Sequence, residues 1–277
     1  MNKKIKEIVI NKLFLFEEFL FFTGLIVWSF IRAHNPDIFG LEKFMDMSLV
    51  NTILRTQYFP PPDPWLSGFT VNYYYFGHFV TAVLTKMSTL PSTITYNLMI
   101  GTVFGLTFSG AFSLCFNLIS LAKTHSFSSK FWIKALLAGL LAATLLTLGS
   151  NLHTIYALTQ GYQISDDNHF VRPPWKLIGA PNPGIYWYPS AVRMIPYSIH
   201  EFPAYSFVVS DLHAHLLDIP FVLATLTLLL AFFHKLKSDS SNLANSLAIL
   251  KRYSAHLMVL SALLAVLYMT NSLDSAV

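Results

Sequence analysis

The sequence predicts an all-α polytopic membrane protein with about five transmembrane helices and juxtamembrane helices in two long external loops. Of the 277 residues, 54% are hydrophobic and only 12% are charged, whereas an ordinary soluble domain has about 25% charged residues. Apolar stretches of roughly 20 residues, the length that crosses the hydrocarbon core of a bilayer, recur along the chain. Lysines and arginines gather in a few of the connecting segments, a bias that orients membrane helices.

The first predicted span, residues 13–31, follows four lysines and superficially resembles a secretion signal. It is too long for one, and no small-residue cleavage site follows it. We therefore expect an uncleaved anchor in the plasma membrane with a cytoplasmic N-terminus. Glu17 and Glu18 interrupt this span, so they either lie near the cytoplasmic interface or pack against another helix.

Further spans are predicted at residues 96–121, 132–149, 212–233 and 254–270. The shorter apolar stretch 76–87 is the ambiguous one. If it crosses the membrane, the lysines of residues 123–134 lie outside; if it is juxtamembrane or re-entrant, every basic cluster is cytoplasmic. We therefore expect five crossings in a single transmembrane domain, 1–277, with external loops at about 32–95 and 150–211. The abrupt stop after the last span leads us to expect an N-terminal part of a longer protein.

Charge and cysteine content exclude some classes of function. The net charge of +4 is mild, and no basic run interleaved with aromatic residues indicates binding to nucleic acid. Cys115 is the one cysteine, so neither an internal disulfide nor a cysteine metal site is available.

Two carboxylates follow the first span. On a helix, Glu42 and Asp46 are one turn apart and share a face. Such a pair can accept a proton or hold a divalent cation. The alternative is a solvated helix face on which Lys43 neutralises Asp46.

Aromatic residues dominate the next segment, which contains Trp65, the run Tyr73, Tyr74 and Tyr75, and then His78. Three consecutive tyrosines do not share one face of a helix or strand. They either line a wall that stacks on a sugar or an isoprenoid headgroup, with His78 beside them, or anchor the chain at the membrane interface.

Histidine and carboxylate residues meet again before the fourth span. Asp211, His215 and Asp218 share a face if the segment is helical, whereas Asp211, His213 and His215 align if it is extended. Either arrangement suits a metal ion, Mg or Mn with oxygen ligands and Zn with more imidazole. The alternative is a buried polar network between helices.

Two arginines of the second external loop, Arg172 and Arg193, suit a phosphate, because a guanidinium donates two parallel hydrogen bonds. Pairing of these arginines with Asp166 or Asp167 is the competing interpretation.

These motifs resemble the YYY membrane protein family, named for its tyrosine run, and they cover most of the chain. The residues that carry the resemblance are Asn35-Pro36-Asp37-Ile38, Glu42-Lys43, Met45-Asp46, Phe59-Pro60-Pro61-Pro62-Asp63-Pro64-Trp65, Asn72-Tyr73-Tyr74-Tyr75-Phe76-Gly77-His78, Glu201-Phe202-Pro203 and Asp211-Leu212-His213-Ala214-His215. Phe44 and Ala214 stand where the family commonly has proline. Both departures affect a local turn and not a ligand.

The family is in turn similar to the C-type membrane glycosyltransferases. That similarity implies a helical bundle with an acidic residue shortly after the first span and juxtamembrane helices in the same loop. Here Asp46 is the first candidate for that acidic residue and Glu42 the second, and residues 76–87 would form a juxtamembrane helix.

The leading hypothesis is therefore a glycosyltransferase that moves a sugar from a polyprenyl-phosphate donor to an acceptor outside the cytoplasm. Asp46 or Glu42 accepts a proton, Arg193 steadies the phosphate, and Asp211, His213 or His215 binds phosphate or a divalent cation such as Mg or Mn. Membrane lipid is expected to contact the protein. The alternatives are a transporter or flippase, in which Glu17, Glu18 and the histidines relay protons, and a non-catalytic membrane scaffold.

Overall fold

The computed structural model describes residues 3–122, 129–151, 153, 188–193, 197–239 and 246–276. In these ranges the regular secondary structure is helical. Its elements are α1 (Lys3–Ala33), α2 (Lys43–Arg55), α3 (Phe76–Ser88), α4 (Ser92–Ala122), α5 (Ser129–Leu148), η3 (Tyr188–Val192), α7 (Pro203–Val209), α8 (Ala214–Asp239), α9 (Ser246–Thr270) and η5 (Ser272–Ala276).

Five of these helices are long and apolar enough to cross a membrane, which confirms the predicted fold class. The candidate spans are Lys12–Ala33, Ser92–Ala122, Lys130–Leu148, Ala214–Lys237 and Arg252–Thr270. The ambiguous stretch forms α3, a helix of 13 residues. At 1.5 Å per residue α3 is about 20 Å long, short of the ~30 Å hydrocarbon core.

The chain divides into two compact units. The first contains Met1–Thr144 and Ser210–Val277, and the second contains Leu145–Val209. In the second unit the ring of Tyr188 in η3 stacks on Tyr205 of α7, with ring centroids 5.4 Å apart. The first unit holds four of the spans entirely and carries the site described below.

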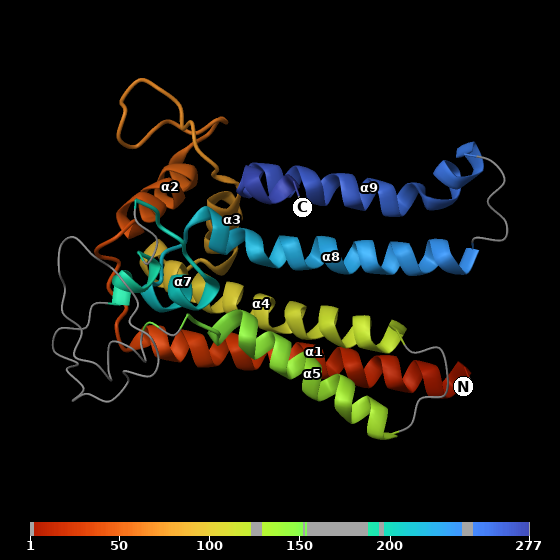
Figure 1. Cartoon of the computed structure of the whole chain (residues 1–277). Coiled ribbons are helices and arrows are strands. Elements are labelled where there is room, and N and C mark those ends of the chain that lie inside the picture. The colour runs from red at the N-terminus through yellow and green to blue at the C-terminus, as the bar shows by residue number, and fades with distance from the viewer. Residues whose placement is uncertain are drawn as a thin grey trace, which may run out of the picture. The chain divides into compact units, whose positions relative to one another are not determined.

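The long helices of the first unit pack in the order α1, α4, α8 and α9 (Figure 1). Glycines bring α1 and α4 close together. A Cβ atom added to Gly24 would lie 2.9 Å from the Cα of Gly105, and one added to Gly105 would lie 2.6 Å from the carbonyl oxygen of Phe21. Next to this contact Trp28 stacks on Phe104 at 4.4 Å. Small residues at such a crossing let membrane helices approach closely.

The short helices α2 and α3 lie at one end of this bundle, where α1 ends and α4 begins (Figure 1). There the buried Arg32 side chain of α1 donates from Nε and Nη2 to the Oδ1 atom of Asn97 in α4, at 2.9 and 2.6 Å. A Cβ atom on Gly77 would lie 2.7 Å from the Cβ of Leu217, so α3 packs directly on the first turns of α8. Helix α3 therefore packs against α2, α4, α8 and α9.

Candidate functional site

Helix α2 positions the first two candidate residues. Glu42 is the residue just before the helix, and Asp46 lies in its first turn, with the backbone N–H of Asp46 donating to the carbonyl oxygen of Glu42 at 3.1 Å. A carboxylate in the first turn of a helix is favoured by the helix dipole. The two side chains are one turn apart, as their spacing predicts.

Asp46 is fully buried at the centre of the site. The Nε2–H group of His78 in α3 donates to its Oδ1 atom at 3.1 Å, and the two side chains are 1% and 0% exposed. The hydroxyl of Tyr96 in α4 lies 3.4 Å from the other carboxylate oxygen. Among the described residues, Nδ1 of His78 is buried without a hydrogen-bond partner. Asp46 thus ties α2 to α3 and α4.

Tyr96 connects this carboxylate to the segment that precedes α8. Its hydroxyl accepts the backbone N–H of Leu212 at 3.2 Å and lies 3.3 Å from the carbonyl oxygen of Ser210. Tyr96 is 0% exposed. Because its one hydroxyl proton bonds either to Asp46 or to Ser210, the tyrosine and the carboxylate form one buried network.

Glu42 lies at the exposed edge of this network. Its Oε2 atom is 2.7 Å from Nε2 of His213, and the side chains of His213 and Glu42 are 27% and 56% exposed. The hydroxyl of Tyr73 lies 3.2 Å from the same nitrogen. Unlike Asp46, Glu42 is accessible to a molecule from outside the protein.

The two histidines contact each other directly. Nδ1 of His213 is 2.8 Å from Nδ1 of His215, the distance of an N–H···N hydrogen bond. If Nε2 of neutral His213 donates to Glu42, its Nδ1 accepts, and His215 donates.

In this arrangement the Nδ1 atoms of the two histidines face each other, whereas metal ligation requires nitrogen lone pairs that point at the ion. Within the described ranges, no group of three or more His, Cys, Asp or Glu residues is placed to hold a metal ion. The metal role of Asp211, His213 and His215 stays a prediction.

Positive charge lies near Asp211, which is 7% exposed. Burial lowers the pKa of Lys43 below its ordinary value; the charge of Asp211 raises this pKa and that of Arg32 lowers it further. The ammonium of Lys43 donates to the carbonyl oxygen of Phe39 at 3.2 Å. The charge of Asp211 thus favours the charged forms of Lys43 and Arg32 at this end of the bundle.

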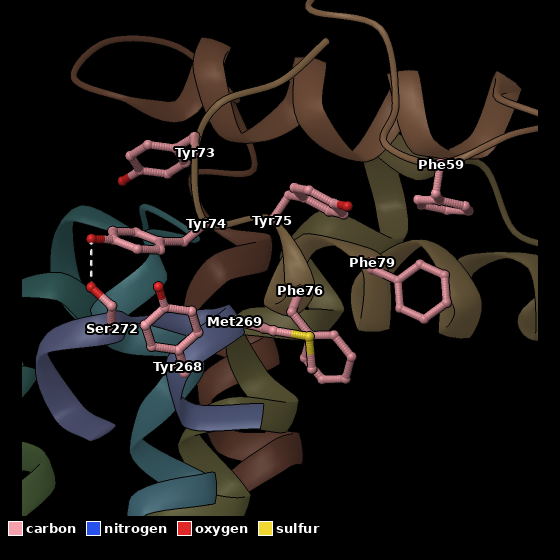
Figure 2. A pocket seen from close by; sticks show the side chains of 9 residues that line it. All are labelled: Phe59, Tyr73, Tyr74, Tyr75, Phe76, Phe79, Tyr268, Met269 and Ser272. Atoms are coloured by element: carbon pink, nitrogen blue, oxygen red, sulfur yellow. Dashed lines mark hydrogen bonds between the residues drawn. The ribbon is translucent and has the colours of Figure 1, made fainter. Parts of the chain in front are cut away.

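An aromatic pocket of about 520 Å³ (Figure 2) adjoins the polar cluster of Glu42, His213 and His215, because Tyr73 lines the pocket and contacts His213. Its lining comes from the segment before α3, from α3 itself, and from the end of α9 with η5. The residues are Phe59, Tyr73, Tyr74, Tyr75, Phe76, Phe79, Tyr268, Met269 and Ser272. The hydroxyls of Tyr74 and Ser272 are hydrogen-bonded to each other at 2.7 Å. Its volume is within the about 300–1,000 Å³ typical of small-molecule sites.

The tyrosine run therefore lines a pocket, but not every residue predicted with it does. Trp65 is 63% exposed on a loop and is not part of the lining. His78 is buried against Asp46, since α3 begins at Phe76 and turns the imidazole away from the tyrosines. Arg193 is exposed in the second unit, and Arg172 lies outside the described residues. Their roles stay predictions.

The sequence analysis does not single out several residues of the site. Tyr96 lies at the start of one predicted apolar span, Tyr268 lies near the end of another, and Ser272 follows that span. A polar aromatic residue at the end of an apolar run was the available signal for Tyr96 and Tyr268. Nothing in the local sequence marks Ser272, because its partner Tyr74 is 198 residues away.

Comparison with known proteins identifies a family but no characterised relative. A family model described as an uncharacterized membrane protein family, DUF2298, matches residues 2–277. No curated protein and no solved structure matches the chain. With its five apolar helices, the protein is an integral multi-pass membrane protein. Because the match covers nearly the whole sequence, the chain belongs to the DUF2298 family of uncharacterised membrane proteins.

Proposed function

We propose that the protein is a membrane glycosyltransferase that moves a sugar from a polyprenyl-phosphate donor to an acceptor on the non-cytoplasmic side of the plasma membrane. One observation carries the proposal: Tyr73 belongs both to the aromatic pocket and to the cluster that holds the exposed carboxylate of Glu42. A pocket for a lipid-linked donor and a group that accepts a proton thus share one side chain.

In the proposed reaction, an acceptor hydroxyl oxygen attacks the anomeric carbon of the sugar. The bond from that carbon to the phosphate oxygen breaks, and the polyprenyl phosphate leaves with the electron pair. The hydroxyl proton passes to a carboxylate, which acts as a general base.

Burial favours Glu42 over Asp46 as this base. Sequence reasoning places Asp46 first, yet Asp46 is 0% exposed, with both oxygens directed at His78 and Tyr96. A general base must come within hydrogen-bond reach of the proton it removes. We therefore assign proton transfer to Glu42, with His213 orienting it, and assign Asp46 the role of positioning α2.

The distribution of ionisable residues favours a transferase over a transporter. A transporter binds its substrate near the middle of the membrane. Here α2, α3 and the start of α8 lie at one end of the bundle (Figure 1). These elements carry or adjoin the ionisable residues Glu42, Asp46, His78, His213 and His215. Arg193 is proposed to steady the donor phosphate from the second external loop.

The direct test is sugar transfer in proteoliposomes from polyprenyl-phosphate mannose and polyprenyl-phosphate glucose. We expect Glu42→Gln to lower kcat by about 10²–10⁴-fold, the usual contribution of a general base. Asp37→Asn is the matched control, because Asp37 is also an exposed carboxylate in the segment between α1 and α2. Full activity of Glu42→Gln would remove the assignment of the base. Full activity of Asp46→Asn is compatible with Glu42 as base and excludes Asp46.

Sidedness is tested separately with single cysteines in a Cys115→Ser background. Cysteines replace Phe44, Arg193 and Arg252, which are all exposed, and intact cells are treated with a membrane-impermeant thiol reagent. We expect labelling at the first two positions and none at Arg252. Labelling at Phe44 without Arg193 would place the two external loops on opposite sides and favour the transporter.

A further inference from the structure

We infer that the aromatic pocket takes the hydrocarbon chain of the polyprenyl donor and not its sugar, an inference that rests on the proposed function for the identity of that donor. The sequence alone left open whether the tyrosines contact a sugar or an isoprenoid. The lining of the pocket, its position and its neighbours distinguish these two ligands.

The lining consists mainly of aromatic rings, and its polar groups are the hydroxyls of four tyrosines and one serine. It contains three phenylalanines, four tyrosines, one methionine and one serine, and no charged or amide side chain. The hydroxyls of Tyr74 and Ser272 bond to each other, and the hydroxyl of Tyr73 is directed at His213. A sugar requires several precisely placed polar partners, whereas a hydrocarbon chain requires apolar surface.

The position of the pocket matches the boundary of the hydrocarbon core. Tyr268 and Met269 belong to the last turn of the α9 span, and their side chains are 64% and 44% exposed. On the other side the wall comes from Phe76 and Phe79 in α3, which is too short to cross. One wall of the pocket is thus the end of a membrane-spanning helix, where lipid chains are available.

A loop next to the pocket is built to lie in the same boundary. Trp65, Leu66 and Phe69 are 63%, 57% and 63% exposed, and such residues favour the membrane interface. Asp63 is the one charged residue between Arg55 and the tyrosine run. Its Oδ1 atom accepts the backbone N–H groups of Trp65 and Leu66 at 2.8 and 2.9 Å, so the turn is ordered.

This loop and the pocket are one continuous structure. Phe59, at the start of the loop, stacks on Tyr75 and packs edge-on against Phe79, with centroids 6.3 and 5.4 Å apart. The loop returns to the tyrosine run through paired backbone hydrogen bonds between Pro61 and Val71 and between Asp63 and Phe69, at 2.9 and 2.8 Å. A loop anchored in the interface would therefore hold the pocket wall beside the lipid.

The orientation of the ligand follows from Tyr73. Its ring lines the pocket, and its hydroxyl reaches the nitrogen of His213 that contacts Glu42. A chain in the pocket would leave its phosphate and sugar at Tyr73, next to the exposed carboxylate. The chain is thus held by aromatic rings, and the reacting end lies at the polar cluster.

The test is binding of a photoreactive farnesyl phosphate, which carries no sugar, to the purified full chain in nanodiscs. Met269→Trp and Ser272→Trp fill the pocket from two different elements, and we expect each to weaken binding about tenfold or more, equivalent to the loss of roughly two buried methylenes. Met258→Trp is the matched control, because it makes the same change on α9 at a side chain that is 67% exposed and outside the lining. This variant should bind as the wild type does.

Competition separates the possible ligands. Farnesyl phosphate should compete, and dodecyl phosphate, a phospholipid and inorganic phosphate should compete at least about tenfold less well. Equal competition by dodecyl phosphate or the phospholipid would mean that the pocket takes any lipid chain, and competition by inorganic phosphate would mean that the headgroup alone binds. Either result overturns the inference.

Mapping of the cross-linked residue by mass spectrometry uses the wild-type protein and needs no folded variant. Labelling of a residue that lines the pocket supports the inference, and labelling elsewhere overturns it. Because no sugar is present, the outcome is independent of transfer activity. Pocket-dependent binding without sugar transfer would support the inference and contradict the proposed glycosyltransferase activity. Sugar transfer that is unaffected by Met269→Trp would support the activity and contradict the inference.

Discussion

Asp46→Ala should destabilise the protein far more than Glu42→Ala, although both changes remove a carboxylate paired with a histidine. The Asp46–His78 pair is 0% and 1% exposed, and the Glu42–His213 pair is 56% and 27% exposed. Removal of one partner from a buried pair costs about 3–5 kcal/mol, because the other is left buried and unpaired. An exposed pair contributes about 0–1 kcal/mol.

These magnitudes convert into melting temperatures. In a chain of this size each kcal/mol shifts Tm by about 2–4 °C, so Asp46→Ala should lower Tm by roughly 6–20 °C and Glu42→Ala by less than about 4 °C. Thermal unfolding in one detergent, followed by tryptophan fluorescence, measures both. The buried Trp28, stacked on Phe104, reports on the α1–α4 contact.

A double-mutant cycle makes the reasoning refutable. His78→Ala should be as harmful as Asp46→Ala, and the double variant should lose less than the sum of the two, with a coupling of about 0.5–3 kcal/mol. If the two changes add, or if Asp46→Ala shifts Tm no more than Glu42→Ala, the carboxylate does not organise the site as described.

Three further changes test other contacts. Tyr96→Phe removes the acceptor of the Leu212 N–H group and should cost about 1–3 kcal/mol in thermal unfolding; an unchanged Tm would show that the buried hydroxyl is not needed. Gly105→Ala places a Cβ atom 2.6 Å from a backbone oxygen of α1 and should cost about 1–3 kcal/mol, whereas Gly110→Ala, 3.3 Å from a flexible Leu223 side chain, should cost less. Asp63→Ala frees two backbone N–H groups and should speed amide hydrogen exchange at Trp65 and Leu66 with little change in Tm; protection equal to wild type would contradict the turn.

The spans were predictable because lipid exposure leaves a strong signal in the sequence, but the helix ends were less so. The predicted span 96–121 belongs to a helix that begins four residues earlier, at Ser92. Ser92, Thr93 and Thr95 are polar, so the apolar run that marks the span in the sequence begins only after them. Their backbone hydrogen bonds nevertheless continue the helix, which begins directly after Pro91, whose carbonyl oxygen accepts from Ile94 and Thr95.

The candidate site was only partly predictable, because spacing along one helix is a local property and partners from other helices are not. The i,i+4 relation of Glu42 and Asp46 needed only the sequence. Their opposite exposure depends on His78, Tyr96 and His213, which come from three other segments of the chain. The direct contact of His213 with His215 also required the structure, since α8 begins between them, at Ala214.

The dual placement of Tyr73 has a thermodynamic consequence. A ligand that turned this ring in the pocket would change its contact with His213, and a molecule bound at Glu42 would change the freedom of the same ring. Binding at the two places would then be reciprocal, because each ligand would alter the affinity for the other by the same factor. A single tyrosine would in this way make the occupancy of the aromatic pocket and that of the exposed carboxylate depend on each other.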